Sequence, residues 1–128
     1  MEVDSIRRFC LSFPRTKEKL QWGETLVFKV EEKIFAMVSL EVDSGTRICL
    51  KCSPESFSQL LEREGAHPAP YVGRYKWIGL EQLDTLRDAE LQELIGQSYT
   101  LVAKRVGKTG RPRKKAKRTK RSGKKSTR

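Results

Sequence analysis

The chain changes character near residue 104, and this break decides which residues can fold together. Residues 104–128 hold 14 of the 27 Lys and Arg residues, with no Asp, no Glu, no aromatic residue and only two apolar side chains. A segment with so few apolar groups and so much like charge cannot bury a core. The sequence therefore predicts one folded domain at residues 1–105, followed by a disordered Lys/Arg-rich tail at residues 106–128.

The strongly basic character of the protein belongs to this tail. The formal net charge of the whole chain is +11. The 13 basic and 16 acidic side chains of residues 1–103 leave that part at about −3, and all ten aromatic residues lie within it. The first part of the chain therefore has the composition of a globular domain.

Targeting signals and cysteine content bear on the compartment. No secretory apolar core follows basic residues at the start, and no apolar run approaches the roughly 20 residues that span a bilayer. Cys10, Cys49 and Cys52 are an odd number of cysteines, which favours reduced thiols over a secreted disulfide framework. We therefore expect a soluble, cytoplasmic protein, nucleoid-associated if bacterial, without a membrane partner.

Hydrophobic periodicity predicts one helix and three strands in the first half of the domain. Asp4 is the expected N-cap of the helix, whose apolar residues recur at helical spacing through Ile6, Phe9, Cys10 and Phe13. Apolar alternation then predicts an antiparallel meander with strands at residues 25–30, 34–40 and 46–52. The segment from Arg15 to Gly23 is predicted to be a polar connection between the first helix and the first strand.

Two helices and one strand are predicted in the second half. Ser53 is an N-cap with Pro54 at the first helical position, and a loop with prolines at positions 68 and 70 follows this short helix. A strand is expected at residues 75–80, and Asp88 opens a last helix whose apolar pattern ends near residue 104. This order predicts the α+β class, a two-layer sandwich with an antiparallel sheet and helices on one face.

Several short motifs of the chain resemble those of a known protein family. They are Trp22-Gly23 before a strand, Val27-Phe28-Lys29-Val30 with Lys33-Ile34-Phe35-Ala36, Leu50-Lys51 with Ser53-Pro54-Glu55, Pro68-Ala69-Pro70-Tyr71 with Gly73-Arg74, Trp77, and Ser98-Tyr99 with Leu101-Val102. In this order and spacing they resemble the YjbR family, also called MmcQ/YjbR-like, over about residues 2–106. The resemblance implies a frataxin-like or secretion-chaperone-like α+β domain and a DNA-binding role, with no shared catalytic set.

The tail lies outside this resemblance and predicts nucleic-acid binding by its charge. Lys and Arg side chains at this density release condensed counterions from a phosphate backbone, with little sequence preference. A solubilising tail is the alternative, but the charge exceeds what solubility needs. The candidate contacts in the tail are Lys108, Arg111, Arg113, Lys114, Lys115, Lys117, Arg118, Lys120 and Arg121.

Within the tail, the Gly-Arg-Pro sequence at residues 110–112 resembles an AT-hook. Gly110 and Pro112 favour a thin, extended backbone. Arg111 and Arg113 would then follow the narrow, strongly negative minor groove of A·T tracts. Chance is the competing explanation in so basic a segment, because the motif is only three residues long.

Two basic clusters in the domain are further candidates for phosphate or base contact. The first interleaves rings and cations in Tyr71, Arg74, Tyr75, Lys76 and Trp77. Packing within the sheet is its alternative, because Tyr75 and Trp77 would share one face of a strand. The second cluster, Arg15, Lys17 and Lys19, reads as a solvated loop or as a phosphate contact.

Metal binding and catalysis receive little support. Cys49-x-x-Cys52 together with Cys10 and His67 supplies the ligand types of a zinc site, but a spacing of three on a strand sends the first two thiols to opposite faces. His67 is the only histidine, and no nucleophile motif or carboxylate cluster accompanies it. We expect no enzyme activity, no metal, no cofactor and no small-molecule substrate.

The sequence thus favours a non-enzymatic protein that binds duplex DNA, with most of the contacts supplied by the tail. An α+β domain attached to a basic tail also fits a different class, a protein-interaction module or an RNA- or ribosome-associated module. Binding to duplex DNA, compared with binding to RNA and to an acidic polymer, separates these hypotheses.

Residues 1–105 should fold cooperatively without the tail, because all periodic apolar positions lie inside that span. A truncated chain of these residues should show the circular dichroism spectrum and the single melting transition of the full protein. Collapse of either signal upon truncation would show that the tail belongs to the folded unit.

Overall fold

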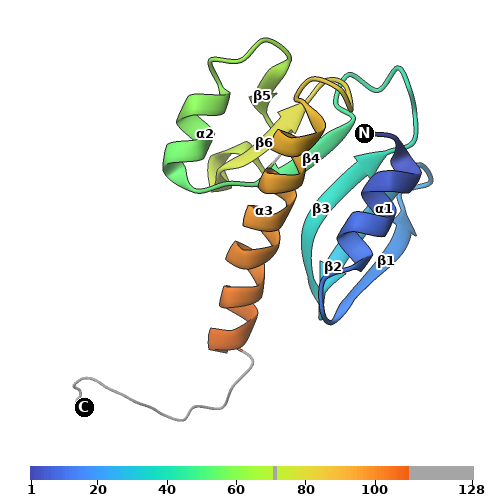
Figure 1. Ribbon diagram of the computed structural model, residues 1–128, viewed down its shortest axis with the longest axis vertical. Coiled ribbons are helices and arrows are strands. Elements are labelled where there is room, and N and C mark those ends of the chain that lie inside the picture. Colours follow the sequence, from blue (N-terminus) through green and yellow to red (C-terminus); the bar gives the residue numbers. More distant parts are fainter. Residues whose placement is uncertain (71, 110–128) are drawn as a thin grey trace.

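The computed structural model describes residues 1–70 and 72–109, with the backbone alone for residues 105–109 (Figure 1). The elements in chain order are α1 (Val3–Leu11), β1 (Thr16–Gln21), β2 (Thr25–Val30), β3 (Lys33–Ser39), β4 (Ile48–Lys51), α2 (Pro54–Leu60), β5 (Ala66–Pro68), η1 (Gly73–Tyr75), β6 (Trp77–Leu80) and α3 (Asp88–Thr109). The six strands form one sheet in the order β1-β2-β3-β4-β6-β5, and every neighbouring pair is antiparallel. The predicted α+β class is therefore confirmed.

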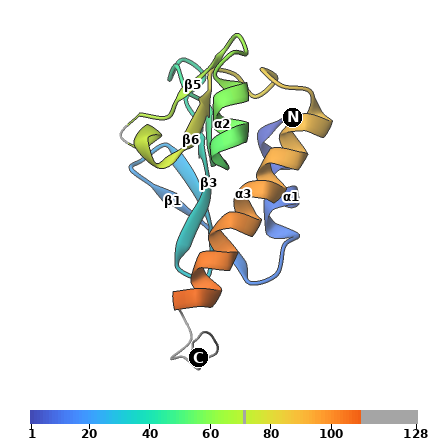
Figure 2. The same cartoon turned by 90° about the vertical axis from the view of Figure 1, so that its left-hand side faces the viewer.

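The three α-helices lie on the same side of the sheet, as the turned view shows (Figure 2). The segment with η1, coloured yellow-green, lies on the opposite side. The hydrophobic core fills the layer between helices and sheet and includes Ile6, Phe28, Leu50, Ile78 and Ile95. The two-layer arrangement follows from the strand pattern, because the core residues of β2, β4 and β6 lie on one face only: Phe28 and Val30, Ile48 and Leu50, and Ile78 and Leu80.

Two strands were missed by the sequence reading, and both lie at the edges of the sheet. Residues 16–21, interpreted as a polar connection, form β1, which pairs with β2. Its sequence, Thr-Lys-Glu-Lys-Leu-Gln, lacks apolar alternation because an edge strand exposes much of both faces. Residues 66–68 form β5, where Pro68 is tolerated because an edge strand has free N–H positions.

Some predicted boundaries are wrong by a few residues. The first helix begins at Val3 after Glu2, so Asp4 lies in the first turn and is not the N-cap. The strand expected at residues 75–80 begins at Trp77, because Lys76 adopts a left-handed conformation with φ 69° and ends η1. The strand expected at 46–52 is restricted to β4.

The caps of the later helices are where the sequence places them. Ser53 caps α2, its Oγ accepting a hydrogen bond of 3.2 Å from the backbone N–H of Ser56. Asp88 begins α3 as predicted, but the helix continues to Thr109, five residues beyond the end of its apolar pattern. Residues 106–109, assigned to the tail, are thus helical in backbone.

A bulge in β3 fixes where α3 packs. Phe28 of β2 pairs with Ala36 whereas Lys29 pairs with Ile34, so Phe35 is the extra residue. The fully buried hydroxyl of Ser98 in α3 donates to the carbonyl of Phe35 at 2.6 Å and accepts from the backbone N–H of Lys51 at 3.0 Å. One side chain therefore joins α3 to both β3 and β4.

Aromatic rings next to Ser98 connect α3 and the bulge to the end of α1. The ring of Tyr99 stacks on Phe13 at 4.5 Å between centroids and meets Phe35 edge-on at 5.3 Å. The Tyr99 hydroxyl donates to the carbonyl of Pro14 at 2.8 Å. The end of α1, the bulge and α3 are thus held in one cluster. In the described part of the chain no helix is both long and apolar enough to cross a membrane.

Replacing Ser98→Ala should lower the free energy of unfolding by about 1–3 kcal/mol, because it leaves one buried carbonyl and one backbone N–H without their partner. Urea unfolding of the full chain measures this difference. Thr100→Ala, on the exposed side of the same helix, is the matched control and should change stability by only a few tenths of a kcal/mol. Equal losses in both variants would contradict the bridging role of Ser98.

Candidate nucleic-acid interface

The face of the sheet turned away from the helices, called the open face below, carries its own row of side chains. Strand pairing places Lys19 beside Val27, Val27 beside Met37, Met37 beside Cys49, and Cys49 beside Gly79. Since side chains alternate along each strand, the residues of this row point away from the core. The open face therefore has a partly buried centre, with Val27 fully buried and Met37 and Cys49 half-buried, and lysines along β1 and β2.

The charges on the strands are strongly asymmetric. The six strands contain five lysines and a single carboxylate, Glu18. Glu18 lies on the helix side, where it accepts hydrogen bonds of 2.9 and 2.7 Å from Nε and Nη2 of Arg7 in α1. These bonds lower the pKa of Glu18. No strand carboxylate therefore reaches the open face, whereas lysines do.

Three lysines gather on β1 and β2. Lys17 lies directly opposite Lys29, and Lys19 is two residues further along β1 on the same face. Lys17 is paired with Glu32 at 2.7 Å, and this bond, with smaller contributions from Lys29 and Lys19, lowers the pKa of Glu32. Like charges directly opposite each other destabilise a sheet. Glu32 offsets part of this repulsion, and an anion bound at the same place would offset more of it.

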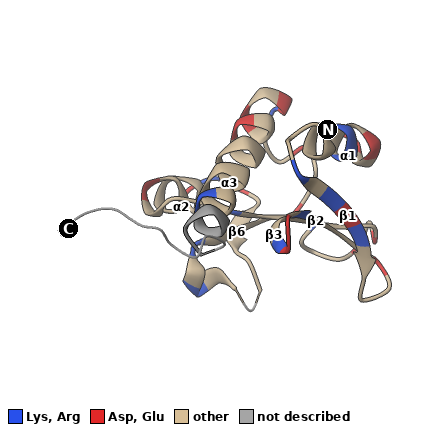
Figure 3. Cartoon of the chain, turned by 90° about the horizontal axis from the view of Figure 1, so that it is seen from below, with Lys and Arg blue, Asp and Glu red and all other residues tan. Residues whose placement is uncertain are grey.

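The remaining lysines of the cluster keep their charge available. Within the described residues, neither Lys19 nor Lys29 has an ion-pair partner. Arg15, at the start of β1, is paired with Glu31 in the turn between β2 and β3. Figure 3 shows the basic residues of β1 in blue, with the acidic residue between them in red. Glu32 offsets part of the charge of Lys29 and Lys19, because both contribute to lowering its pKa. An anion approaching β1 and β2 would therefore meet two lysines that form no salt bridge of their own.

A groove of about 320 Å³ lies on the open face. Trp22, in the turn between β1 and β2, and Pro70, in the segment between β5 and β6, both line it, together with Met37 and Cys49 of the central strands. Its polar lining residues are Thr25, Ser39, Glu41, Ser44, Thr46 and Arg47. Only 9% of Arg47 is exposed, and its Nε donates to the carbonyl of Ser39 at 3.0 Å. The groove therefore combines apolar walls with hydrogen-bond donors and acceptors, including one cationic and one anionic side chain.

The predicted contacts Arg74 and Lys76 lie beside one another but face different rings. The guanidinium of Arg74 is 4.9 Å from the centroid of Tyr75, and the ammonium of Lys76 is 5.3 Å from the ring of Phe57 in α2. Because Tyr75 belongs to η1, it does not share a sheet face with Trp77, which corrects the sequence reading. Tyr71 lies outside the described residues.

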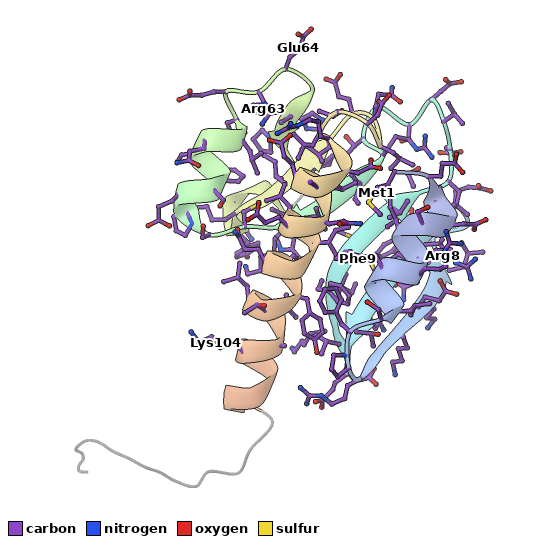
Figure 4. The ribbon with its side chains drawn as sticks, in the orientation of Figure 1. Met1, Arg8, Phe9, Arg63, Glu64 and Lys104 are labelled. Atoms are coloured by element: carbon purple, nitrogen blue, oxygen red, sulfur yellow. The ribbon has the colours of Figure 1, made fainter. Side chains whose placement is uncertain are left out.

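Most of the predicted tail contacts also lie outside the described residues. Lys108 is in the last turn of α3, where only the backbone is described. Lys104, the last residue of the helix whose side chain is described, extends from α3 on the side away from α1 (Figure 4). The tail positions outside the description are Arg111, Arg113, Lys114, Lys115, Lys117, Arg118, Lys120 and Arg121.

Sequence reasoning missed Trp22, Lys29, Arg47 and Lys51 as members of the open face. Lys29 and Lys51 stand between apolar neighbours in predicted strands, and their alternation could have placed them opposite the core. Lys51 donates from Nζ to the carbonyl of Tyr75 at 3.1 Å, which ties β4 to the segment with η1. Arg47 stands beside Ile48 in the strand expected at residues 46–52, so the same alternation could have placed it on this face. Trp22 had no such signal, because it stands in a turn.

The thiols and the histidine occupy separate structural positions. Cys49 lies on the open face and Cys52 in the core, as their spacing predicts. Burial raises the pKa of each thiol to about 11. His67 contacts Thr46 Oγ1 through Nε2 at 3.2 Å, and a Cβ on Gly79 would lie 3.0 Å from the imidazole. Among the described residues, no three His, Cys, Asp or Glu side chains are grouped to hold a metal ion.

This architecture defines an α+β protein with a six-stranded antiparallel sheet covered on one face by helices. The chain belongs to the YjbR family, whose model matches residues 11–101. No curated protein matches it. Protein DR2400 of Deinococcus radiodurans, with a DUF419 domain, is 28% identical and has a TM-score of 0.70, over 85% of this chain and 80% of that one.

A protein from Pseudomonas syringae, the structural genomics target PsR293, shares the fold at 22% identity. Its TM-score is 0.67, over 80% of this chain and 99% of that one. The predicted family is therefore confirmed. These likenesses establish the fold and leave function to be argued from the residues.

Glu18→Gln should lower the stability of the full chain at neutral pH, with the loss disappearing in acid. Arg7 holds the pKa of Glu18 below its ordinary 4.5 in the folded state, so the carboxylate stabilises the fold above that value and loses this contribution as it protonates. Urea unfolding at about pH 7 and at several values below about 4.5 would measure the difference. Glu24→Gln, in the exposed β1–β2 turn, is the control. A difference that stays constant with pH would contradict this assignment.

Proposed function

We propose that this protein binds nucleic acid without catalysing a reaction, and that duplex DNA is its main ligand. The observation that carries the proposal is the charge asymmetry of the sheet. Lysines populate the open face, and the only strand carboxylate is turned to the helix side and paired with Arg7. A phosphate backbone is the polyanion that such a surface, joined to a basic tail, would fit.

Half of the 16 acidic residues lie in two segments away from this surface, which supports the proposal, while five others stand in the turns that border it: Glu24, Glu31, Glu32, Glu41 and Asp43. Residues 53–66 and 81–94, which include α2 and the beginning of α3, contain eight Asp and Glu but only two Arg. Both arginines, Arg63 and Arg87, are paired with Glu90. Repulsion between these acidic segments and a phosphate backbone would turn the helix side of the domain away from a polyanion.

The tail supplies the larger share of the positive charge. Residues 110–128 add 11 Lys and Arg with no carboxylate. The end of α3, from which they continue, projects past the end of the sheet (Figures 1 and 2). Phosphate contacts from these residues would give affinity with little sequence preference, and Arg111 and Arg113 would add a preference for A·T tracts if they enter the minor groove.

The environment of the nucleophilic groups supports a non-enzymatic role. Burial raises the pKa of Cys10, Cys49 and Cys52 to about 11 or 12, so each remains a thiol at neutral pH. His67 is engaged by Thr46 and by the carbonyl of Pro68. A binding role therefore accounts for the described residues more fully than an acid–base or nucleophilic one.

Binding to duplex DNA should weaken steeply with salt. If the tail and the open face neutralise about six phosphates, the slope of log affinity against log salt should be near −5. Removing residues 110–128 should flatten the slope to between about −2 and zero, because Lys19 and Lys29 would then be the main cations without a salt bridge in the β1–β2 cluster. Fluorescence anisotropy with a labelled duplex, across a salt series, measures both slopes. An unchanged slope after truncation would rule out the tail, and tighter binding to RNA or to an acidic polymer would favour the alternative classes.

Replacing Arg111 and Arg113 with lysine should abolish any preference for A·T-rich over G·C-rich duplex while leaving the salt slope intact. Lysine keeps the charge but lacks the planar guanidinium suited to a narrow minor groove. Competition between the two duplexes measures the preference. If the wild type binds both duplexes equally, the minor-groove hypothesis is wrong and phosphate contacts are the only contribution of the tail.

A further inference from the structure

We propose that the groove beside Trp22 holds one unpaired base of a single-stranded nucleic acid, stacked on the indole ring of Trp22. This inference rests on the proposed function and extends it from phosphate contact to base contact. Three observations carry it: the exposure of Trp22, the composition of the groove, and the lysines that adjoin it.

Trp22 is displayed in a way that folding alone does not explain. The residue is 71% exposed, although a tryptophan ring gains most from burial. Its backbone is left-handed, with φ 53°, a conformation that a bulky residue rarely adopts. Gly23 follows with φ 79°, so the tight turn between β1 and β2 requires this backbone. A strained, exposed aromatic residue at the rim of a groove is typical of a ligand contact.

The groove offers what a nucleobase needs. Trp22 and Pro70 line it from two separate turns, and the thioether of Met37 and the Cys49 side chain supply apolar surface between strands. At its polar side, Arg47 and Glu41 provide a cation and a carboxylate, and hydroxyl groups of Thr25, Ser39 and Ser44 lie among the lining residues. A base presents a flat π-face together with donors and acceptors on its edge, so both kinds of surface are used.

The lysines indicate where the phosphates would lie. Lys19 is three residues from Trp22 on the same hairpin, and Lys29 lies on the adjacent strand of the open face. With a rise of about 3.3 Å per residue, the β1 lysines stand within roughly 20 Å of the ring along the strand. A chain whose base occupies the groove would therefore run its phosphates over the lysines of β1 and β2.

Only an unpaired base fits this arrangement. In a duplex each base is stacked between its neighbours, and its face reaches a protein ring only if the base is extruded. Single strands expose that face, and stacking on an aromatic ring tolerates any base sequence. The tail still binds both forms through phosphates, so the groove adds a preference for single strands over what charge alone provides.

The test compares Trp22 variants of the full chain on a single-stranded oligothymidylate and a blunt duplex with the same number of phosphates. Trp22→Gly, which suits the left-handed backbone, should bind the single strand about tenfold more weakly and the duplex unchanged. Trp22→Phe should retain most of the affinity. Leu20→Ala is the matched control, since Leu20 is exposed on the same hairpin but points to the helix side. An oligouridylate of equal length tests RNA.

Tryptophan fluorescence gives a second readout that does not depend on affinity. In a Trp77→Phe background Trp22 is the only tryptophan, and saturating single strand should quench its emission while saturating duplex should not. If Trp22→Gly binds the single strand like wild type, or if the duplex quenches equally, the inference is wrong while the proposed function stands. If the wild type binds neither nucleic acid in a salt-dependent way, both are wrong.

Discussion

The two hydrogen bonds of Ser98 are the interaction on which the arrangement of the fold depends. The β3 bulge turns the carbonyl of Phe35 out of the strand ladder into the core, where an unpaired carbonyl would be costly. Ser98 satisfies it and also receives the backbone N–H of Lys51, so α3 can lie across the sheet in only one position. The ring of Phe35 then meets Phe13 and Tyr99, which brings the end of α1 to the same place.

The three helices cover one face of the sheet, whereas the other face is covered only in part, by the segment with η1. Most core residues of the strands are buried against the helices, so the open face can carry lysines, small polar groups and a groove. Glu18 shows the same division, because its carboxylate serves α1 through Arg7 and thereby leaves the open face without a strand carboxylate. Lys17 opposite Lys29 is a pair of like charges on this face that Glu32 offsets in part, and an anionic ligand would offset it further.

The class of fold and most elements could be predicted because their causes are local. The Ser53 cap and the Asp88 start each depend on a few adjacent residues, and apolar alternation reports β2 and β3 directly. The candidate site could be predicted only in part. Strand β1 has no apolar alternation to report, and the left-handed Lys76 that separates Tyr75 from Trp77 follows from the path of the chain around η1. The groove joins Trp22 to Pro70, which are 48 positions apart, so only the folded sheet reveals it.

The division between tail and open face has a physical logic. Few cations on the open face are uncompensated, so that surface alone would bind a polyanion weakly and would lose the contact in salt. Covalent attachment of a basic tail makes the second contact intramolecular, which raises its effective concentration at the surface of the ligand. The tail can then supply affinity without selectivity, while the rigid sheet, with groups held at defined positions by the Ser98 junction, is the part able to distinguish one form of nucleic acid from another.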